Sequence, residues 1–153
     1  MALQNDTTQQ LILDRSAADF SAAANYAAAV ADTAAQTASL DAGVADYVDC
    51  IVDITNLGSG PVTKVTIVAR TSSKAEPLVT AAADWSAIST EAVDTATGIA
   101  TVVRYQAEFA ITAVGRICAR FPVSERYMSF VVWVDSASGS RGAVYGYRRR
   151  GAQ

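Results

Sequence analysis

The feature that most limits the fold of this chain is the alternation of apolar and polar residues in several short runs. The clearest run is 47–54, YVDCIVDI, in which every second residue from Val48 is apolar. Asp49 and Asp53 occupy intervening positions. A period of two residues is typical of a strand with one face in the core and one in solvent. We therefore predict a half-buried strand at 47–55.

Similar runs recur along the rest of the chain, separated by turn sequences rich in Gly, Ser and Asn at 56–61, 94–98 and 136–140. The next run, 62–71, is expected to pair with 47–55 as an antiparallel hairpin. The run 127–135 is apolar on both faces, which is typical of a covered central strand. Further strands are expected at 85–93, 99–111, 117–121 and 143–149. These seven or eight strands predict a mostly β domain at 46–153, an antiparallel β-sandwich or jelly roll.

Residues 1–45 have a different character, because they are rich in Ala and poor in large apolar side chains. Helix propensity favours a helix at 25–38, but a helix with so little to bury is weakly held. The Thr, Ser and Asp residues of 32–41 favour extended chain instead. Helix and extended chain both remain open, and we favour an extended N-terminal Ala-rich arm that lies on a neighbouring subunit. Its candidate contact residues are the large apolar ones, Leu11, Ile12, Leu13, Phe20 and Tyr26.

The residues that usually carry catalysis are poorly represented. The chain contains no His, which excludes Ser-His-Asp and Cys-His catalysis. Asp49 and Asp53 lie about 13 Å apart along one strand at ~3.3 Å per residue, whereas a glycosidase pair requires about 5–10 Å. We expect these carboxylates to be solvated or to form salt bridges with Lys64 or Arg70 on the neighbouring strand. The sequence predicts no enzyme, no catalytic residue and no cofactor.

Two Gly-rich runs and two cysteines also fit structural roles. The runs 58–60 and 139–142 lack the Gly-Lys-Ser/Thr ending of a phosphate loop and are expected to be turns. Cys50 and Cys118 lie in apolar stretches, so we expect two buried, reduced thiols. Without His they do not complete a usual zinc site, and no metal ligand is assigned. The N-terminus has no signal-peptide pattern, and no run of 18 apolar residues predicts a membrane span.

Charge is distributed unevenly. Residues 1–60 hold eight Asp and one Arg, a net charge of −7, whereas residues 61–153 have a net charge of +4. The chain has ten Arg and only two Lys, and Arg is the cation favoured at protein interfaces. The densest basic run, Arg148, Arg149 and Arg150, is therefore a candidate protein contact, with a solvated tail as the alternative. The acidic balance of the whole chain argues against nucleic acid as its partner.

The order of these segments resembles that of the small capsid cement, or decoration, proteins of tailed bacteriophages. The resemblance rests on the Ala- and Thr-rich segment that ends in 37–43 (TASLDAG), and on the strand at 47–55 with its Gly-Ser-Gly turn and 62–72. It also includes 126–133 (RYMSFVVW), followed by a Gly/Ser turn and a closing strand. Proteins of this family are β-sandwich or jelly-roll domains, often trimers, that clamp neighbouring capsid subunits.

The resemblance implies a non-enzymatic virion structural protein that stabilises an icosahedral phage head by bridging capsid subunits. Its expected partners are the major capsid protein and other copies of itself, as a homotrimer. No membrane, nucleic acid or small-molecule ligand is expected, and the expected location is the capsid surface after synthesis in the host cytoplasm. The alternatives are a phage tail or head–tail connector subunit, or a carbohydrate-binding β-sandwich module. The last would use exposed aromatic residues, from among Trp85, Tyr105, Trp133, Tyr145 and Tyr147.

Overall fold

The protein is mostly β, with two antiparallel sheets in the computed structural model, which describes residues 9–59, 64–93, 96–98, 100–135 and 139–151. Sheet A has the strand order β1-β11-β3-β9, and sheet B has the order β2-β10-β4-β5 with β8 also paired to β4. The strands are β1 (Gln10–Arg15), β2 (Leu40–Asp41), β3 (Tyr47–Asn56), β4 (Lys64–Ser72), β5 (Ser86–Ala87), β6 (Ser89–Val93), β7 (Ala100–Arg104), β8 (Gln106–Ala110), β9 (Gly115–Pro122), β10 (Tyr127–Val134) and β11 (Arg141–Arg149).

The main core lies between the two sheets and is built from the alternating positions of their strands. Strand β3 contributes its alternating apolar residues, Val48, Cys50, Val52 and Ile54, which confirms the predicted alternation. Strand β9 contributes Ala119 and Phe121. From sheet B, Met128 and Phe130 of β10 enter the same core, where the rings of Phe121 and Phe130 lie 5.6 Å apart. Strand β10 is buried along almost all of its length and lies between β2 and β4. The prediction that 127–135 forms a covered central strand is therefore confirmed.

The predicted hairpin between 47–55 and 62–71 is wrong. Both segments are strands, but β3 pairs with β11 and β9 in sheet A, whereas β4 pairs with β10, β5 and β8 in sheet B. The chain crosses from one sheet to the other between them. Alternation identifies which face of a strand is buried, but it does not identify the strand that pairs with it.

The N-terminal residues that the structure describes run along both sheets. Strand β1 adds to the edge of sheet A beside β11, and β2 adds to sheet B beside β10. Between them lie the short helix α1 (Tyr26–Ala31) and the 3-10 turn η1 (Thr33–Ala35). Of the two conformations left open for 25–38, α-helix forms over six residues only. These follow Asn25, whose side chain accepts a hydrogen bond from the Ala28 N–H.

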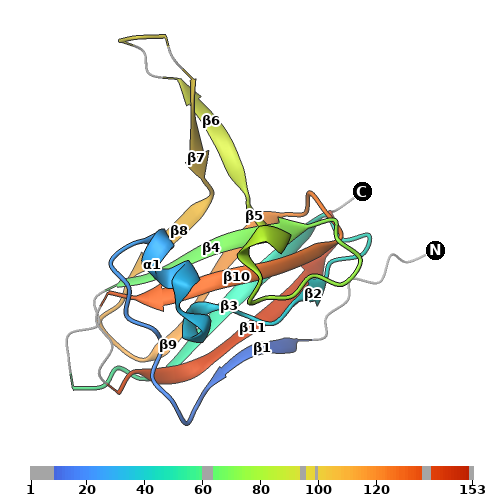
Figure 1. Ribbon diagram of the computed structural model, residues 1–153. Helices are drawn as coiled ribbons and strands as arrows, with labels where there is room; N and C mark the ends of the chain where they lie inside the picture. The colour runs from blue at the N-terminus through green and yellow to red at the C-terminus, as the bar shows by residue number, and fades with distance from the viewer. Residues whose placement is uncertain (1–8, 60–63, 94–95, 99, 136–138, 152–153) are drawn as a thin grey trace.

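This helical segment covers the outer face of sheet B (Figure 1). Ala29 and Ala35 pack on Val68, Val131 and Trp133 in a second, smaller core cluster. Small Ala side chains let the backbone of the segment approach the sheet closely, which explains why an Ala-rich sequence suits this layer. In the part of the chain that the structure describes, no helix has the length and apolar character that crossing a membrane requires.

A two-stranded hairpin, β6–β7, projects away from the two sheets (Figure 1). We call this segment, 89–104, the arm. It is distinct from the N-terminal Ala-rich arm predicted within 1–45. Among the strands that the structure describes, β6 and β7 pair only with each other. The strand predicted at 99–111 is therefore two strands, because the chain leaves sheet B at Ile88 and returns at Tyr105. A third short helical turn, η2 (Ala82–Asp84), precedes β5.

Candidate protein-interaction surfaces

The apolar residues proposed as N-terminal contacts lie in different environments. Ile12 and Phe20 are buried in the main core of this same chain, and Leu13 packs partly against it. Tyr26 packs against the smaller cluster under α1. Leu11 is different, because it is 50 % exposed at the edge of sheet A. Of the five residues, Leu11 is therefore the one whose side chain is well placed to meet another subunit.

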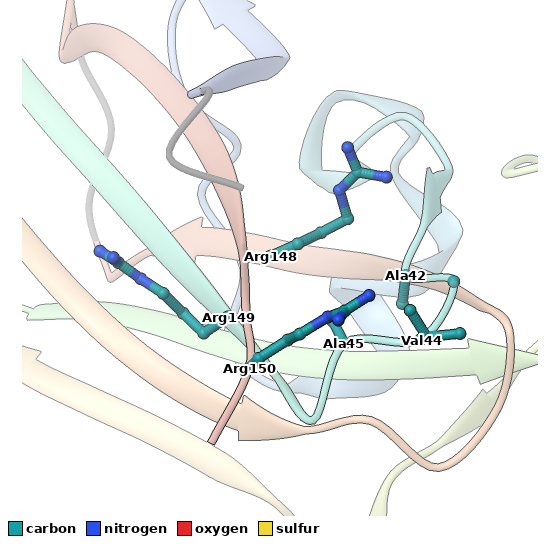
Figure 2. A pocket seen from close by; sticks show the side chains of 7 residues that line it. Ala42, Val44, Ala45, Arg148, Arg149 and Arg150 are labelled. Atoms are coloured by element: carbon teal, nitrogen blue, oxygen red, sulfur yellow. The ribbon is translucent and has the colours of Figure 1, made fainter. Parts of the chain in front are cut away.

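The basic run at the end of β11 divides between two faces. In Figure 2, Arg148 and Arg150 extend toward the loop of 42–45, whereas Arg149 extends to the opposite side. The three arginines and the 42–45 loop line a recess of about 350 Å³, beside which Val44 is 76 % exposed. Arg148 donates a 3.4 Å hydrogen bond from Nη1 to the carbonyl of Asp41. The recess thus combines cationic side chains with an exposed apolar one.

Arg149 belongs to an ion-pair cluster on the outer face of sheet A. Asp49, on the neighbouring strand β3, accepts hydrogen bonds from Arg120 Nε at 2.7 Å and Nη2 at 3.1 Å, and from Arg149 Nε at 2.9 Å. Asp49 is only 3 % exposed. This burial is the largest single influence and acts to raise the pKa of Asp49, but the hydrogen bonds and positive charges of the two arginines together outweigh it, and the pKa lies below its ordinary value.

The partners predicted for the two β3 carboxylates are wrong. Asp53 pairs with Arg116 Nε at 3.2 Å, and Asp49 pairs with Arg120 and Arg149. Neither reaches Lys64 or Arg70, because those residues are on sheet B. The arginines of β9 and β11 take their place, since those strands flank β3 in sheet A.

Tyrosines lie among these arginines on the same face. The Arg116 guanidinium lies 5.9 Å from the ring centre of Tyr145, and the Arg149 guanidinium 5.1 Å from that of Tyr147. The Tyr147 hydroxyl donates a 2.8 Å hydrogen bond to Gln9 Oε1. Tyr and Arg are the residues most enriched where proteins bind one another.

Cys118 also lies on this face. It is exposed on the edge strand β9, so the expectation that both thiols are buried holds for Cys50 alone. Both cysteines are free. The apolar residues around Cys118 suggested burial. Cys118 instead alternates with the more buried Ile117 and Ala119 along β9, so its side chain points outward. We call the outer surface of β1, β11, β3 and β9 the sheet A face. None of the described helical segments lies over it, in contrast to the outer face of sheet B (Figure 1).

The sheet A face is not apparent from the sequence. The alternation of Tyr145, Tyr147 and Arg149 in β11 is visible in the sequence. What is not visible is that β3 and β9, with their Asp and Arg residues, lie beside it. The face is assembled by pairing between segments up to about 140 residues apart, as in the 138-residue separation of Gln9 and Tyr147.

The two tryptophans are buried rather than displayed. Trp133 packs beneath α1, and Trp85 donates a hydrogen bond from its indole nitrogen to the Leu78 carbonyl at 2.9 Å. Trp85 also lies under the guanidinium of Arg70, at 5.2 Å. Of the aromatic residues considered for sugar stacking, Tyr105 is largely exposed at the base of the arm.

Within the described residues, no group of three or more Cys, Asp or Glu is arranged to hold a metal ion. Comparisons with protein-family models, with curated proteins and with solved structures give no match.

Proposed function

We propose that this chain is a non-enzymatic structural subunit of a phage particle, a capsid cement or decoration protein that bridges neighbouring capsid subunits. Binding to the assembled shell and not to free subunits would stabilise the shell by mass action. In this proposal the two sheets form a β-sandwich of the jelly-roll type, since β3, β4, β9, β10 and β11 alternate between them. The subunit acts at the capsid surface as a homotrimer.

The observation that carries this proposal is the arm. An isolated two-stranded hairpin is at best marginally stable in water and requires further strands or a packing surface. Within the described residues, β6 and β7 have no third strand beside them. At ~3.3 Å per residue, the five-residue strands β6 and β7 alone extend about 17 Å. Such an extension is suited to reaching across the boundary between two neighbouring subunits.

Two alternatives remain, and the geometry weighs differently on each. A phage tail or head–tail connector subunit would use the same arm for contacts between subunits. A carbohydrate-binding module requires exposed, open aromatic rings. Both tryptophans are buried, and guanidinium groups lie over the rings of Tyr145 and Tyr147. The arrangement of the aromatic residues therefore favours protein contact over sugar stacking.

Particle composition tests the proposal directly. Phage particles should contain this chain at a fixed ratio to the major capsid protein, measured by quantitative mass spectrometry. Cryo-electron microscopy should place it on the outside of the head, with the arm over a subunit boundary. Location in the tail or at the head–tail junction would support the alternative instead, and absence from purified particles would contradict both.

The arm itself is tested by a deletion that spares the sheets. Tyr105 N donates to the Ile88 carbonyl at 2.7 Å, so residues 89–104 can be replaced by an Asn-Gly turn. The shortened protein should remain folded but bind undecorated heads at least about tenfold more weakly, a loss of ~1.4 kcal/mol. A matched control replaces only the described tip residues 96–98 with Gly-Ser-Gly. Undiminished binding by the deletion variant would contradict the role of the arm.

A further inference from the structure

The sheet A face has a layered chemical pattern that becomes clear when the strand register is followed across it. Antiparallel residues directly opposite one another point to the same side of the sheet. One row across the face is therefore Leu11, Tyr145, Ile51 and Cys118, from β1, β11, β3 and β9 in that order. Every member is apolar or aromatic, and none of the four is fully buried.

Rows that carry charges lie on both sides of this apolar row. The row on one side is Asp14, Ala143, Asp53 and Arg116, again in the order β1, β11, β3 and β9. The row on the other side contains Tyr147, Asp49 and Arg120, and beyond it Arg149 lies opposite Tyr47. An apolar centre with a polar, charge-paired border is the anatomy of a protein interface.

We propose that the sheet A face packs against the same face of a second copy of this chain, about a two-fold axis that runs parallel to the strands between β11 and β3. Such an axis places β11 opposite the partner's β3 and β1 opposite the partner's β9. Each row then lies against the same row of the partner. The proposal goes beyond the proposed function, because the contact needs no other protein and is made in solution. It is also separate from contacts made by the arm, so that the arm's contact with a neighbouring subunit and this two-fold contact can coexist.

The apolar row is complementary to itself under this operation. Tyr145 meets the partner's Ile51, and Leu11 meets the partner's Cys118. Each contact occurs twice in a two-fold interface. The four side chains thereby lose the solvent contact that they have in the single chain, where Leu11 is half exposed. Burial of such apolar surface is the main favourable term in association.

Charge complementarity decides the direction of the axis. With the axis parallel to the strands, Asp14 meets the partner's Arg116, and Arg149 meets the ring of the partner's Tyr47. An axis across the strands would instead place Asp53 on the partner's Asp49 and Arg116 on the partner's Arg120. Like charges in direct opposition cost several kcal/mol, so the parallel axis is favoured.

The mixed signs on the face also favour a second copy over a strongly charged foreign partner. The face carries Arg116, Arg120 and Arg149 against Asp14, Asp49 and Asp53. These charges cancel. A surface that docks onto itself requires both signs, because a surplus of one would repel its own image. A face selected for an acidic or basic partner would carry uncompensated charge.

The face has the size of a small specific interface, with about 1,000 Å² for the two partners together against a lower limit of ~1,000 Å². Four strands at ~4.8 Å and eight residues at ~3.3 Å span about 19 by 26 Å, or ~500 Å² before side-chain relief is counted. Typical specific interfaces bury ~800 Å² per partner. Two sheets packed face to face keep their strands within about 30° of each other, which an axis parallel to the strands permits.

The native thiols provide the first test. Cys118 is exposed on the face, whereas burial raises the pKa of Cys50 well above its ordinary value and keeps it from reacting. In sedimentation velocity, the purified protein should form dimers as its concentration rises toward ~100 μM. Alkylation of Cys118 by N-ethylmaleimide should slow at least fivefold over the same range. A monomer at ~1 mM, or dimers with unprotected Cys118, would overturn the proposal.

Paired charge reversals provide the second test. Asp14→Arg and Arg116→Asp should each weaken the homodimer at least about tenfold, because each places like charges opposite one another. When the two variants are mixed, both contacts of the heterodimer again join opposite charges, and dimers should return. Glu76→Arg, a charge reversal on an exposed loop outside the sheet A face, is the control and should dimerise normally.

Thermal unfolding of each variant shows whether it remains folded. If both folded variants stay monomeric on mixing, the proposed axis is wrong. If neither single variant weakens the dimer, the sheet A face is not the contact. Because no phage component enters these measurements, their failure leaves the capsid proposal standing, and the converse also holds.

Discussion

At the scale of single residues, Asp49 is a carboxylate that is almost fully buried on a face otherwise open to solvent. The chain covers it with its own arginines. Arg120 binds it through two nitrogens and Arg149 through one, while both guanidinium groups still reach water. The hydrogen bonds from the two arginines compensate the carboxylate for its lost hydration. An isolated buried charge would have no such compensation.

Asp49→Asn should therefore destabilise the protein moderately. The change removes charge-assisted hydrogen bonds but leaves the arginines able to solvate, so we expect a loss of about 1–2 kcal/mol in the free energy of unfolding. Urea denaturation measures it. Asp53→Asn is the matched control, because its partner Arg116 is more than half exposed, and it should cost less than about 0.5 kcal/mol. Equal losses in the two variants would contradict the special role of Asp49.

The same carboxylate should produce a pH-dependent difference between wild type and Asp49→Asn. The pKa of Asp49 is lower in the folded protein than its ordinary value of 3.8. Its contribution is therefore fully present above that value and is lost as pH falls through the folded pKa. Unfolding free energies measured from pH 7 to pH 2.5 should show the gap between the two proteins narrowing below pH ~4. A gap that widens on acidification would reverse the assigned sign.

Arg70 is a second buried charge, and only 1 % of it is exposed. Burial lowers its pKa. Its Nε donates to Ser129 Oγ at 3.0 Å and its Nη2 to the Val79 carbonyl at 3.4 Å, beneath the ring of Trp85. Arg70 thereby fastens the segment before β5 to the outer side of sheet B. Arg70 alternates with the apolar residues Ile67 and Ala69 in the sequence, and this alternation does not reveal that a loop covers it.

Arg70→Lys should loosen that segment even though the charge is retained. A lysine ammonium cannot reproduce the planar fork or the stacking on Trp85, so we expect a loss of about 1–3 kcal/mol. Tryptophan emission should shift to longer wavelength as Trp85 gains water. Lys74→Ala in the same segment breaks only the exposed pair with Asp84 and should cost less than about 1 kcal/mol. An unchanged emission spectrum in Arg70→Lys would contradict this role.

At the scale of elements, short-range patterns predicted strands well and their partners poorly. The apolar positions of β3, β9 and β10 could be assigned from alternation, and the structure buries them as expected. The pairing of β3 with β11 and β9 depends on contacts between distant segments, which periodicity does not encode. The division of 99–111 at Tyr105 was hidden for a similar reason, since both halves have strand-like sequence.

Strand β11 illustrates how close the pairing in sheet A is. Its register with β3 is interrupted between Arg141 and Gly142. A Cβ at Gly142 would overlap the carbonyl oxygen of Asp53, so Gly142→Ala should displace the two strands and destabilise the protein by at least about 2 kcal/mol. A Cβ at Gly146, in the same strand, would meet side-chain atoms and not backbone, with Leu40 Cδ2 nearest at 3.2 Å and Ile12 Cδ1 at 3.6 Å, so Gly146→Ala should cost less. Chemical denaturation of both variants distinguishes them, and equal costs would contradict this account.

The N-terminal segment also behaves as part of the domain rather than as a detachable piece. Ile12, Phe20 and Leu40 are core residues, and β1 completes sheet A. Deletion of residues 1–40 should therefore unfold the protein, as measured by loss of near-ultraviolet circular dichroism and of cooperative thermal unfolding. Deletion of residues 1–8, which retains every described strand, should not. A folded 41–153 fragment would show that the segment is dispensable.

At the scale of the whole molecule, the sequence indicated a mostly β protein and a surplus of Arg over Lys. It did not show where those arginines gather. Arg116, Arg120 and Arg149 come from two strands and converge only because β3 lies between them. The charge contrast between the two halves of the chain, read from the sequence as polarity, is largely neutralised within sheet A, where acidic β3 meets basic β9 and β11.

The attachment of the arm has a mechanical consequence. The Tyr105 N–H closes the base of the arm by donating a hydrogen bond to the Ile88 carbonyl, and the Ile88 N–H joins this base to sheet B by donating to the Ala69 carbonyl. Force applied along the arm would load these hydrogen bonds one after another and not all at once. In the proposed contact with a neighbouring subunit, the arm would therefore act as a compliant tether, one that yields when the neighbour moves while the two sheets behind it keep their shape.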